Sequence, residues 1–309
     1  MEDRQEIIQW LLDSDPSIRW QVQRDLLCEP EVIYKRERAK LQHTGWSAEV
    51  LKQQDPDGLW NQRLYIGKWI STTYTLYLLK LLGLPPGHLQ ALRGCEQLLN
   101  QGLYQGEKIR YWQDESVEDL AVTSLVVSVC SYFHLKSEPL ERVAEYLARH
   151  QASDGCWCME ESLTVRDYNF ETTLLALDAL LQFTRLHPRQ NDALMSSAIE
   201  RGQNYLLDQQ LGIAGGKALK QKWTSFSFPA YWHYDVLTAL DYFRESKADK
   251  DIRFQPAIDL LLAKQNRDGK WALGNRHHGK TYIEMEEGGA PSRWNTLRAL
   301  RVLKWWYGE

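Results

Sequence analysis

Two kinds of helix alternate along this chain, judged from its hydrophobic and polar positions. One kind has apolar residues at three- and four-residue spacing and Lys, Arg or Glu on the opposite face, which is typical of helices in contact with water. The other kind is apolar almost all round, as over 173–181, which predicts burial on more than one side. The amphipathic helices are expected over 46–53, 89–100, 140–151, 197–209 and 254–264, and the buried helices over 70–82, 119–134, 171–183, 234–243 and 294–305.

The first part of the chain adds two helices, over 4–13 and 17–28, and Asp15-Pro16 marks the start of the second. No segment alternates apolar and polar residues over a sustained stretch, so strands are not expected. The fold class predicted is therefore all-α. We expect a single domain over 1–309, with N-terminal helices over 1–45 and repeats over 46–309.

A seven-residue pattern forms a corner between an amphipathic helix and the buried helix that follows. It consists of Gln, two residues, Asp-Gly, one residue and Trp, and it occurs at 54–60, 151–157 and 265–271. Asp-Gly marks a tight turn, because glycine takes positive φ angles that other residues resist, and the Trp offers a large apolar surface. Weaker copies are expected over 101–112 and 208–212, which gives a repeat of roughly 50–60 residues.

Repeats of outer helix, corner and inner helix can stack as an open superhelix or close into a ring. An open array would leave one face of each unit charged and exposed. The inner helices are apolar all round, so they favour closure. The architecture predicted is an α/α toroid, in which helical hairpins close into a barrel.

Composition excludes some functions without naming one. The chain has 37 basic and 41 acidic residues, a net charge of −4 and no long run of one sign, so nucleic-acid binding is not expected. A transmembrane segment and a secretory signal are not expected either. Five cysteines, an odd number, favour reduced thiols and a cytoplasmic location. The 13 Trp and 15 Tyr residues make an aromatic-lined ring a plausible place for a ligand.

The three corners resemble the QW repeats of the squalene–hopene cyclases and of the wider terpenoid cyclase and protein prenyltransferase superfamily. The resemblance extends from about Trp46 onward and is more specific for fold than for activity. It implies an α/α toroid whose central cavity opens where the inner helices begin, with length for only one of the two barrels of squalene cyclases. It also implies that an isoprenoid or other apolar small molecule is bound or converted there.

At the start of each inner helix a polar or ionisable group stands beside an aromatic residue or, in one case, a hydroxyl, and a closed ring would bring these groups to one opening. Helix capping is the alternative explanation, although a cation such as Arg293 at a helix start opposes the helix dipole. The expected catalytic residues are Asp119, Glu171, His233 and Asp235, and the expected substrate-binding residues are Trp69, Thr72, Tyr168, Asn169, Tyr234, Arg293, Trp294 and Asn295.

Several chemistries fit such a site. Class II terpenoid cyclisation needs an acid that protonates an alkene or epoxide, and aromatic faces that stabilise the resulting cation. The Asp-x-Asp-Asp motif of squalene–hopene cyclases is missing, and Glu118-Asp119 is at best a degenerate acid pair. Carbohydrate-active α/α toroids use paired carboxylates instead, for which Asp119, Glu171 and Asp235 are candidates. A non-catalytic binding module or partner subunit is the remaining alternative.

A zinc site is a further possibility that the resemblance raises. Protein prenyltransferase β-subunits bind zinc through an Asp-x-Cys pair in a corner and a His that opens a later inner helix. Asp154 and Cys156 resemble the pair, and Cys158 is a second thiol nearby. His233 would supply the imidazole, and such a donor set with one open position makes a catalytic zinc site. The competing interpretation is structural, because the same Asp recurs in the other two corners without a Cys.

The loop over 274–289 carries two adjacent His residues and three acids. One interpretation is a lid that brings Glu286 or Glu287 toward Arg293. The other is a solvated charged loop.

Overall fold

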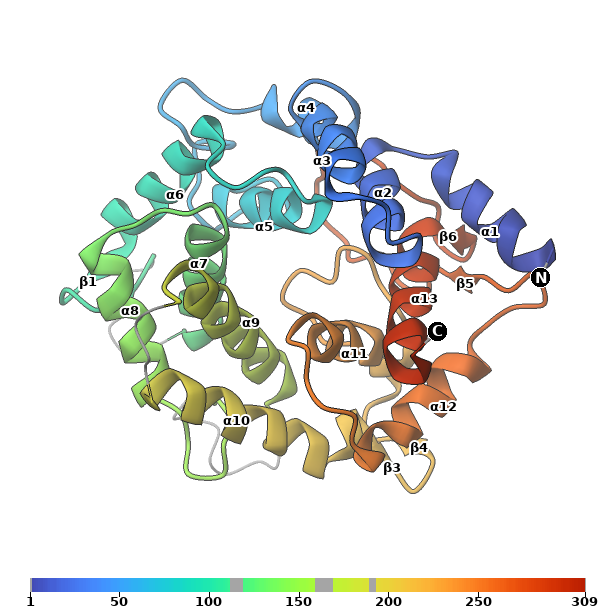
Figure 1. Cartoon of the computed structure of the whole chain (residues 1–309). Coiled ribbons are helices and arrows are strands. Elements are labelled where there is room, and N and C mark those ends of the chain that lie inside the picture. The colour runs from blue at the N-terminus through green and yellow to red at the C-terminus, as the bar shows by residue number, and fades with distance from the viewer. Residues whose placement is uncertain (1, 112–118, 159–168, 189–192, 309) are drawn as a thin grey trace. The chain divides into compact units, whose positions relative to one another are not determined.

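The computed structural model describes residues 2–111, 119–158, 169–188 and 193–308, and Figure 1 labels its elements. The chain forms two compact units, each discontinuous in sequence. Unit 1 comprises Met1–Lys52, Leu81–Pro85 and Leu207–Glu309, and unit 2 comprises Gln53–Lys80 and Pro86–Leu206.

Unit 2 alternates buried and amphipathic helices. The buried ones are α5 (Thr72–Leu82), α7 (Leu120–Tyr132) and α9 (Phe170–Leu186), and the amphipathic ones are α6 (Leu89–Gly102), α8 (Glu138–Arg149) and α10 (Ala193–Asp208). Helix α7 packs along α9, and α6 and α8 pack against α7 (Figure 1). A hairpin of β1 (Leu103–Tyr104) and β2 (Lys108–Ile109) follows α6.

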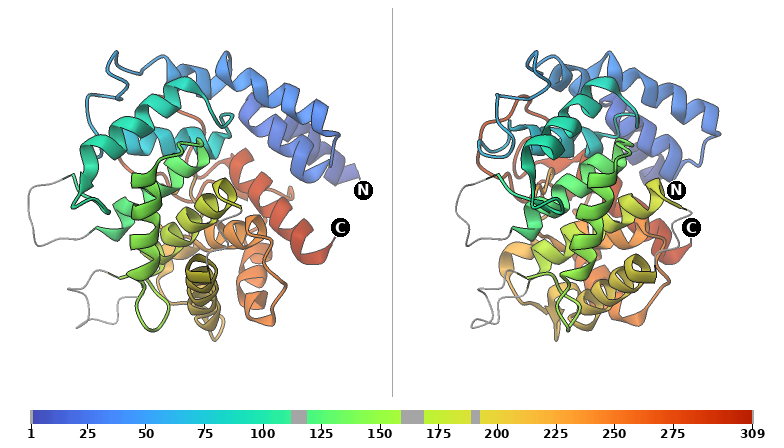
Figure 2. Two further views of the ribbon diagram at one scale, coloured as in Figure 1. Left: turned by 60° about the vertical axis from the view of Figure 1, so that its left-hand side comes forward. Right: turned by 90° about the vertical axis from the view of Figure 1, so that its left-hand side faces the viewer.

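Unit 1 combines the two ends of the chain. Its N-terminal elements are α1 (Glu2–Leu12), α2 (Pro16–Gln21), a π-helical turn η1 (Val22–Leu26), α3 (Glu31–Ala39), η2 (Lys40–Gln42) and α4 (Gly45–Leu51). Its C-terminal elements are η4 (Gln210–Gly212), β3 (Ile213–Ala214), β4 (Lys217–Ala218), η5 (Gln221–Thr224), α11 (Val236–Glu245), η6 (Ile252–Phe254), α12 (Gln255–Ala263), β5 (Trp271–Ala272), β6 (Pro291–Ser292) and α13 (Arg293–Tyr307). Helix α13 packs against α11, α2 and η1, so the blue and red ends of the chain lie together (Figure 2).

The all-α class is confirmed, and each predicted helix corresponds to a helix of the structure. The expectation that strands are absent was wrong in detail, since three pairs of two-residue antiparallel strands are present in the described residues. The β1–β2 pair lies within the weaker corner expected over 101–112, and the β3–β4 pair directly follows the one expected over 208–212. Helix α3 was also missed, because it is short and largely charged. Closure of the ring involves both units and stays a prediction.

The three corners share one hydrogen-bonding pattern. In each, the Gln amide donates to the carbonyl of the corner glycine, at 2.8 Å for Gln54 and Gln151 and 3.0 Å for Gln265. The glycines have φ angles of 90°, 94° and 74°, which explains why the turn requires glycine. The backbone N–H of each corner Trp donates to a threonine hydroxyl in the first turn of the next buried helix, in the pairs Trp60–Thr72, Trp157–Thr173 and Trp271–Thr296. Each corner is therefore fastened to the inner helix that it precedes.

Candidate functional site

The predicted site residues fall into two groups, one in each unit. Unit 2 contains Trp69, Thr72, Asp119, Asn169 and Glu171, together with the proposed metal ligands Asp154, Cys156 and Cys158. Unit 1 contains His233, Tyr234, Asp235, Arg293, Trp294 and Asn295. Tyr168 lies outside the described residues. Convergence of both groups on one opening concerns both units and stays a prediction.

Asp119 is the N-cap of α7. Its Oδ1 accepts hydrogen bonds from the backbone N–H groups of Ala121 and Val122, at 3.0 and 3.1 Å. Burial raises the pKa of this carboxyl above its ordinary value, although the two backbone hydrogen bonds act in the opposite direction. Its Oδ2 accepts no hydrogen bond from a residue that the structure describes. Asp119 is thus held in place through one oxygen and favours the protonated form more than an ordinary Asp.

Unit 2 also contains an aromatic cluster of Tyr65, Trp69, Tyr74 and Tyr111. The Tyr65 ring lies 5.1 Å from that of Tyr74 and 6.4 Å from that of Tyr111, and Trp69 meets Tyr74 edge-on at 4.8 Å. The Tyr74 hydroxyl donates to the Tyr65 oxygen at 2.8 Å. Burial and, in smaller part, the charge of Asp119 raise the pKa of Tyr65, which places its phenol within electrostatic reach of that carboxylate.

Thr72, Asn169 and Glu171 have different surroundings from this cluster. Thr72 is fully buried, and its hydroxyl accepts from Trp60 and donates to the carbonyl of Arg63 at 2.7 Å, so the corner accounts for it. Asn169 is the N-cap residue of α9, and its amide lies 3.8 Å from the Cys156 sulfur. Glu171 is half-buried in the first turn of α9.

The proposed zinc ligands have other partners. Asp154 Oδ1 accepts from the backbone N–H of Cys156 at 3.1 Å, which is its role in the turn. Cys156 is buried, and burial raises its thiol pKa, with hydrogen bonding to Asp154 acting in the same direction. A metal-binding thiol needs the opposite shift. Within the described ranges, no three His, Cys, Asp or Glu side chains are grouped closely enough to hold a metal ion. The described residues at this corner therefore give no support to a zinc site.

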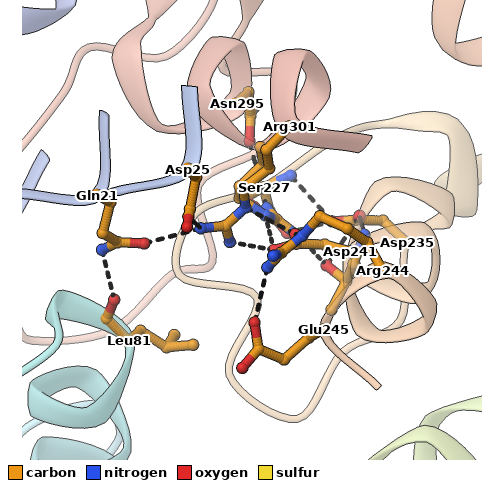
Figure 3. Close-up of polar contacts among 12 residues, drawn as sticks. Gln21, Asp25, Leu81, Ser227, Asp235, Asp241, Arg244, Glu245, Asn295 and Arg301 are labelled. Atoms are coloured by element: carbon orange, nitrogen blue, oxygen red, sulfur yellow. Dashed lines mark hydrogen bonds and ion pairs between the residues drawn. The ribbon is translucent and has the colours of Figure 1, made fainter. Parts of the chain in front are cut away.

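In unit 1, Asp235 is the N-cap of α11 and is almost completely buried. Its Oδ1 accepts from the backbone and hydroxyl of Thr238, and its Oδ2 accepts from the backbone and hydroxyl of Ser227, at 2.7–3.0 Å. Figure 3 shows Asp235 beside Ser227 and the ion pairs of Asp241. Arg298 donates to the Ser227 carbonyl at 2.9 Å. Four donors use both oxygens of Asp235, so this carboxylate has the environment of a structural cap.

His233 lies in a stack of three rings. Its imidazole lies 3.9 Å from that of His277 with an interplanar angle of 15°, and 3.8 Å from the ring of Trp232. His277 Nε2 also lies 3.2 Å from the Ser227 hydroxyl. The loop that contains His277 is thereby attached to the segment that precedes α11.

The start of α13 is built from the loop over 274–289. Glu286 Oε1 accepts from the backbone N–H groups of Arg293 and Trp294 at 2.6 and 3.2 Å, and its Oε2 accepts from the Ser292 hydroxyl at 2.5 Å. Burial raises the pKa of Glu286, against these three hydrogen bonds. Glu286 does lie at Arg293, through the Arg293 backbone, whereas the interpretation of the loop as a lid stays a prediction.

The remaining predicted residues of unit 1 are engaged in packing. The Arg293 guanidinium lies over the Trp10 ring at 4.6 Å, and Trp294 stacks on Phe228 at 4.0 Å. Asn295 is buried and donates to two backbone carbonyls. The Tyr234 hydroxyl donates to a backbone carbonyl at 3.0 Å.

The sequence reasoning missed Tyr65, Tyr74 and Tyr111. It searched only the first few residues of each inner helix, whereas Tyr65 lies in the connection before α5 and Tyr111 lies just after β2. The usable signal was the presence of three aromatic residues, Tyr65, Trp69 and Tyr74, over one connection and the first turn of a helix. No such spacing argument leads to Tyr111.

Comparison with known proteins gives structural neighbours but no family. No family model matches the chain, and no curated protein matches its sequence. A protein from Actinoplanes superposes with a TM-score of 0.47 at 16% identity, over 95% of this chain and 90% of its own. A variant of the type II terpene cyclase MstE from Scytonema, in complex with the substrate geranylgeranyl dihydroxybenzoate, superposes with a TM-score of 0.46 at 17% identity. The superposition covers 94% of this chain and 85% of the MstE chain. Likeness at this level establishes neither a family nor an activity. None of the helices in the described part of the chain combines the length and apolar composition of a transmembrane segment.

Proposed function

We propose that this chain binds an isoprenoid or similar apolar small molecule against the aromatic cluster of unit 2, and that Asp119 is the proton donor in its conversion. The observation that carries the proposal is a half-buried carboxyl with a raised pKa within electrostatic reach of Tyr65, which belongs to a cluster of four aromatic rings. The resemblance of the corners to QW repeats supports the same class of ligand.

The chemistry follows from what an alkene requires. Protonation of a carbon–carbon double bond needs a carboxylic acid that keeps its proton, which burial of Asp119 favours. The carbocation that results is stabilised by the faces of aromatic rings, each worth about 0.5–2 kcal/mol. Asp119 is positioned by the α7 backbone through Oδ1, which leaves the other oxygen for the proton. The structure gives the carbohydrate alternative less support, because Asp235 is engaged by four donors.

Ligand binding tests the proposal. A thermal-shift and tryptophan-fluorescence screen would use geranylgeraniol, geranylgeranyl diphosphate, squalene and cello-oligosaccharides. We expect the isoprenoids to bind, and Tyr65→Ala, which removes a half-buried ring of the cluster, to weaken binding about tenfold or more, since an aromatic contact of about 1–2 kcal/mol is lost. Product analysis after incubation would then show turnover in the wild type and none in Asp119→Asn.

The control is Tyr307→Ala, which removes an exposed tyrosine at the end of α13. Binding of the oligosaccharides alone would overturn the proposal. If the isoprenoids bind but no product forms, the binding site would be supported and the catalytic role of Asp119 would be contradicted.

A further inference from the structure

A polar triad crosses the three buried helices of unit 2. Lys80 of α5 donates from Nζ to the Ser128 hydroxyl of α7 at 2.7 Å and forms an ion pair with Asp178 of α9. The Ser128 hydroxyl donates to Asp178 Oδ2 at 2.6 Å. The Lys80 ammonium also lies 5.4 Å from the centre of the Tyr77 ring. Gln182 of α9 also donates to Asp178 Oδ1 at 3.3 Å. One cation, one anion and one hydroxyl therefore form a set with no net charge.

Packing alone does not require these charges. The side chains of Lys80 and Asp178 are 8% and 21% exposed, and they lie on helices whose other residues are mostly buried and apolar. Removing an ion from water costs several kcal/mol, and replacing a buried ion pair by apolar residues of similar volume is often neutral or stabilising. Asp178 retains exposure although Leu177 and Ala179, its neighbours in α9, have none. Its side chain therefore keeps partial contact with solvent.

The three residues also lie at one depth. Lys80, Ser128 and Asp178 each come eight residues after the first residue of their helix, which is Thr72 in α5, Leu120 in α7 and Phe170 in α9. With a rise of 1.5 Å per residue, each lies about 12 Å along the helix from its N-terminus. The aromatic cluster and Asp119 are at the N-terminal ends of α5 and α7. The triad therefore lies about two helical turns beyond the aromatic cluster, measured along the same helices.

We infer that the triad is a subsite for an oxygen-bearing end, a hydroxyl or a carbonyl, of the apolar ligand. This inference rests on the proposed function, because the hydrocarbon part would lie against the aromatic cluster. The triad has no net charge, so it suits a neutral oxygen and not a diphosphate. The Ser128 hydroxyl already donates to Asp178, so Lys80, whose ammonium has three N–H groups for two described acceptors, supplies the donor, and Asp178 supplies an acceptor. The distance of about 12 Å along the helices selects ligands long enough to reach from the aromatic cluster to the triad.

Two ligands that differ only at the end group test this assignment. Dissociation constants of the wild type would be measured by tryptophan-fluorescence quenching for an all-trans C20 isoprenoid alcohol and for the hydrocarbon of the same length. We expect the alcohol to bind about tenfold more tightly, the size of one well-formed hydrogen bond to a charged group. The double variant Lys80→Met, Asp178→Leu is expected to bind both ligands equally and to keep the wild-type affinity for the hydrocarbon.

Two further variants keep the test decisive. Lys52→Met with Glu49→Leu removes a solvent-exposed ion pair and is expected to leave the alcohol preference unchanged. Ser128→Ala is the second test variant, should the double variant fail to fold, and we expect it to reduce the preference severalfold with unchanged circular dichroism.

The possible failures are distinguishable. Equal binding of the two ligands by the wild type, or a preference that survives in the double variant and in Ser128→Ala, would overturn the subsite while leaving the aromatic cluster as a binding site. The triad would then serve only to fix the packing of α5, α7 and α9. A wild type that binds neither ligand would overturn the proposed function together with the subsite.

Discussion

Asp119 and Asp235 occupy the same position, the N-cap of a buried helix, and yet differ in environment. Asp119 accepts two backbone hydrogen bonds on one oxygen, whereas Asp235 accepts four hydrogen bonds on both. The Asp119 carboxyl is partly removed from water, and its two backbone hydrogen bonds do not offset that cost for the charged form, so its pKa is raised. A cap needs only an acceptor, so the ionisable group at Asp119 is not explained by capping.

Replacing Asp119 by Asn should not weaken the fold at pH 7. Asn keeps the acceptor oxygen and is as good an N-cap as Asp. Because the folded-state pKa of Asp119 is raised, the wild type loses stability as pH rises from the ordinary value of 3.8 through the folded pKa, and Asn does not. We expect Asp119→Asn to be at least as stable as the wild type at pH 7, with the difference vanishing toward pH 3. Asp119→Ala should lose about 1 kcal/mol through loss of the cap.

Urea denaturation at several pH values measures this difference. An Asn variant that is clearly less stable than the wild type at neutral pH would contradict it, since the carboxylate would then be favourable in the folded state.

The matched change at Asp235 should have the opposite result. The NH₂ group of Asn cannot accept a hydrogen bond, so either the Ser227 or the Thr238 donors would lose their acceptor in a buried place. Leaving such groups unsatisfied costs about 1–3 kcal/mol. We expect Asp235→Asn to lower the free energy of unfolding by that amount in the same denaturation experiment. An unchanged stability would show that the cap tolerates an amide.

At the scale of elements, the first two corners each dock on the next amphipathic helix. Gln54 and Gln151 donate a second hydrogen bond to carbonyls of α6 and α10, at 2.8 and 2.9 Å. Glycines on those helices, Gly94 and Gly202, leave room for the corner tryptophans, because a Cβ there would lie 2.8 Å from Trp60 or 2.6 Å from Trp157. The helix–corner spacing is therefore set by two glycines that the sequence pattern did not include.

The third corner has α1 where the other corners have the next amphipathic helix. A Cβ on Gly269 would lie 2.7 Å from the Ile7 side chain, and Lys270 lies over the Trp10 ring at 4.6 Å. The N-terminal helix thus covers the last corner within unit 1. Gln265 makes its hydrogen bond to Gly269 and is exposed, so this docking depends on apolar and cation–π contacts.

Gly202→Ala tests the docking of the second corner. In an open helix, Ala in place of Gly would add about 1 kcal/mol of stability. Here the new Cβ would overlap Trp157 and approach Leu177 at 2.9 Å, so we expect a loss of about 1–3 kcal/mol instead. Thermal or urea unfolding measures it. Gly288→Ala is the control, because its Cβ would meet no atom closer than 3.6 Å, and its effect should stay within about 0.5 kcal/mol. A more stable Gly202→Ala variant would refute the close packing.

At the largest scale, an ion network joins the two ends of the chain. Arg301 of α13 pairs with Asp241 of α11 and donates to Gln21 at 2.8 Å, and its distance to Asp25 is 3.2 Å (Figure 3). Burial alone would raise the pKa of Asp241, but the guanidinium groups of Arg301 and Arg244 outweigh burial and hold its pKa below the ordinary range. Segments more than 200 residues apart in sequence are held together by this network.

Removal of one charge from this network should weaken unit 1 strongly. Asp241→Asn leaves buried guanidinium groups without their carboxylate, which costs about 3–5 kcal/mol. A lowered folded-state pKa means that the stabilisation is present above the ordinary value of 3.8 and is lost as pH falls through the folded pKa. We therefore expect the wild type to lose stability on acidification and Asp241→Asn to lose less.

Denaturation at pH 7 and pH 3 compares the two proteins, with Glu49→Gln as a surface ion-pair control of small effect. Parallel pH profiles for the wild type and the Asp241 variant would contradict the role of Asp241.

The sequence by itself determined the helices and the corners, because both depend on local physics. Periodic apolar residues specify which face of a helix is buried, and Asp-Gly requires a turn with positive φ whatever surrounds it. It also placed Trp69 and Asp119 in a candidate site, since both are next to the start of an inner helix.

Only the tertiary structure decided which polar groups are already satisfied and which are not. Asp119 and Asp235 look alike in sequence, and their difference comes from Ser227, which precedes Asp235 by eight residues, and from burial. The Lys80–Ser128–Asp178 triad joins residues up to 98 positions apart, and no local pattern announces it. Burial and hydrogen-bond partners come from segments distant in sequence, and these two quantities determine whether a carboxyl or an ammonium serves the fold or a ligand.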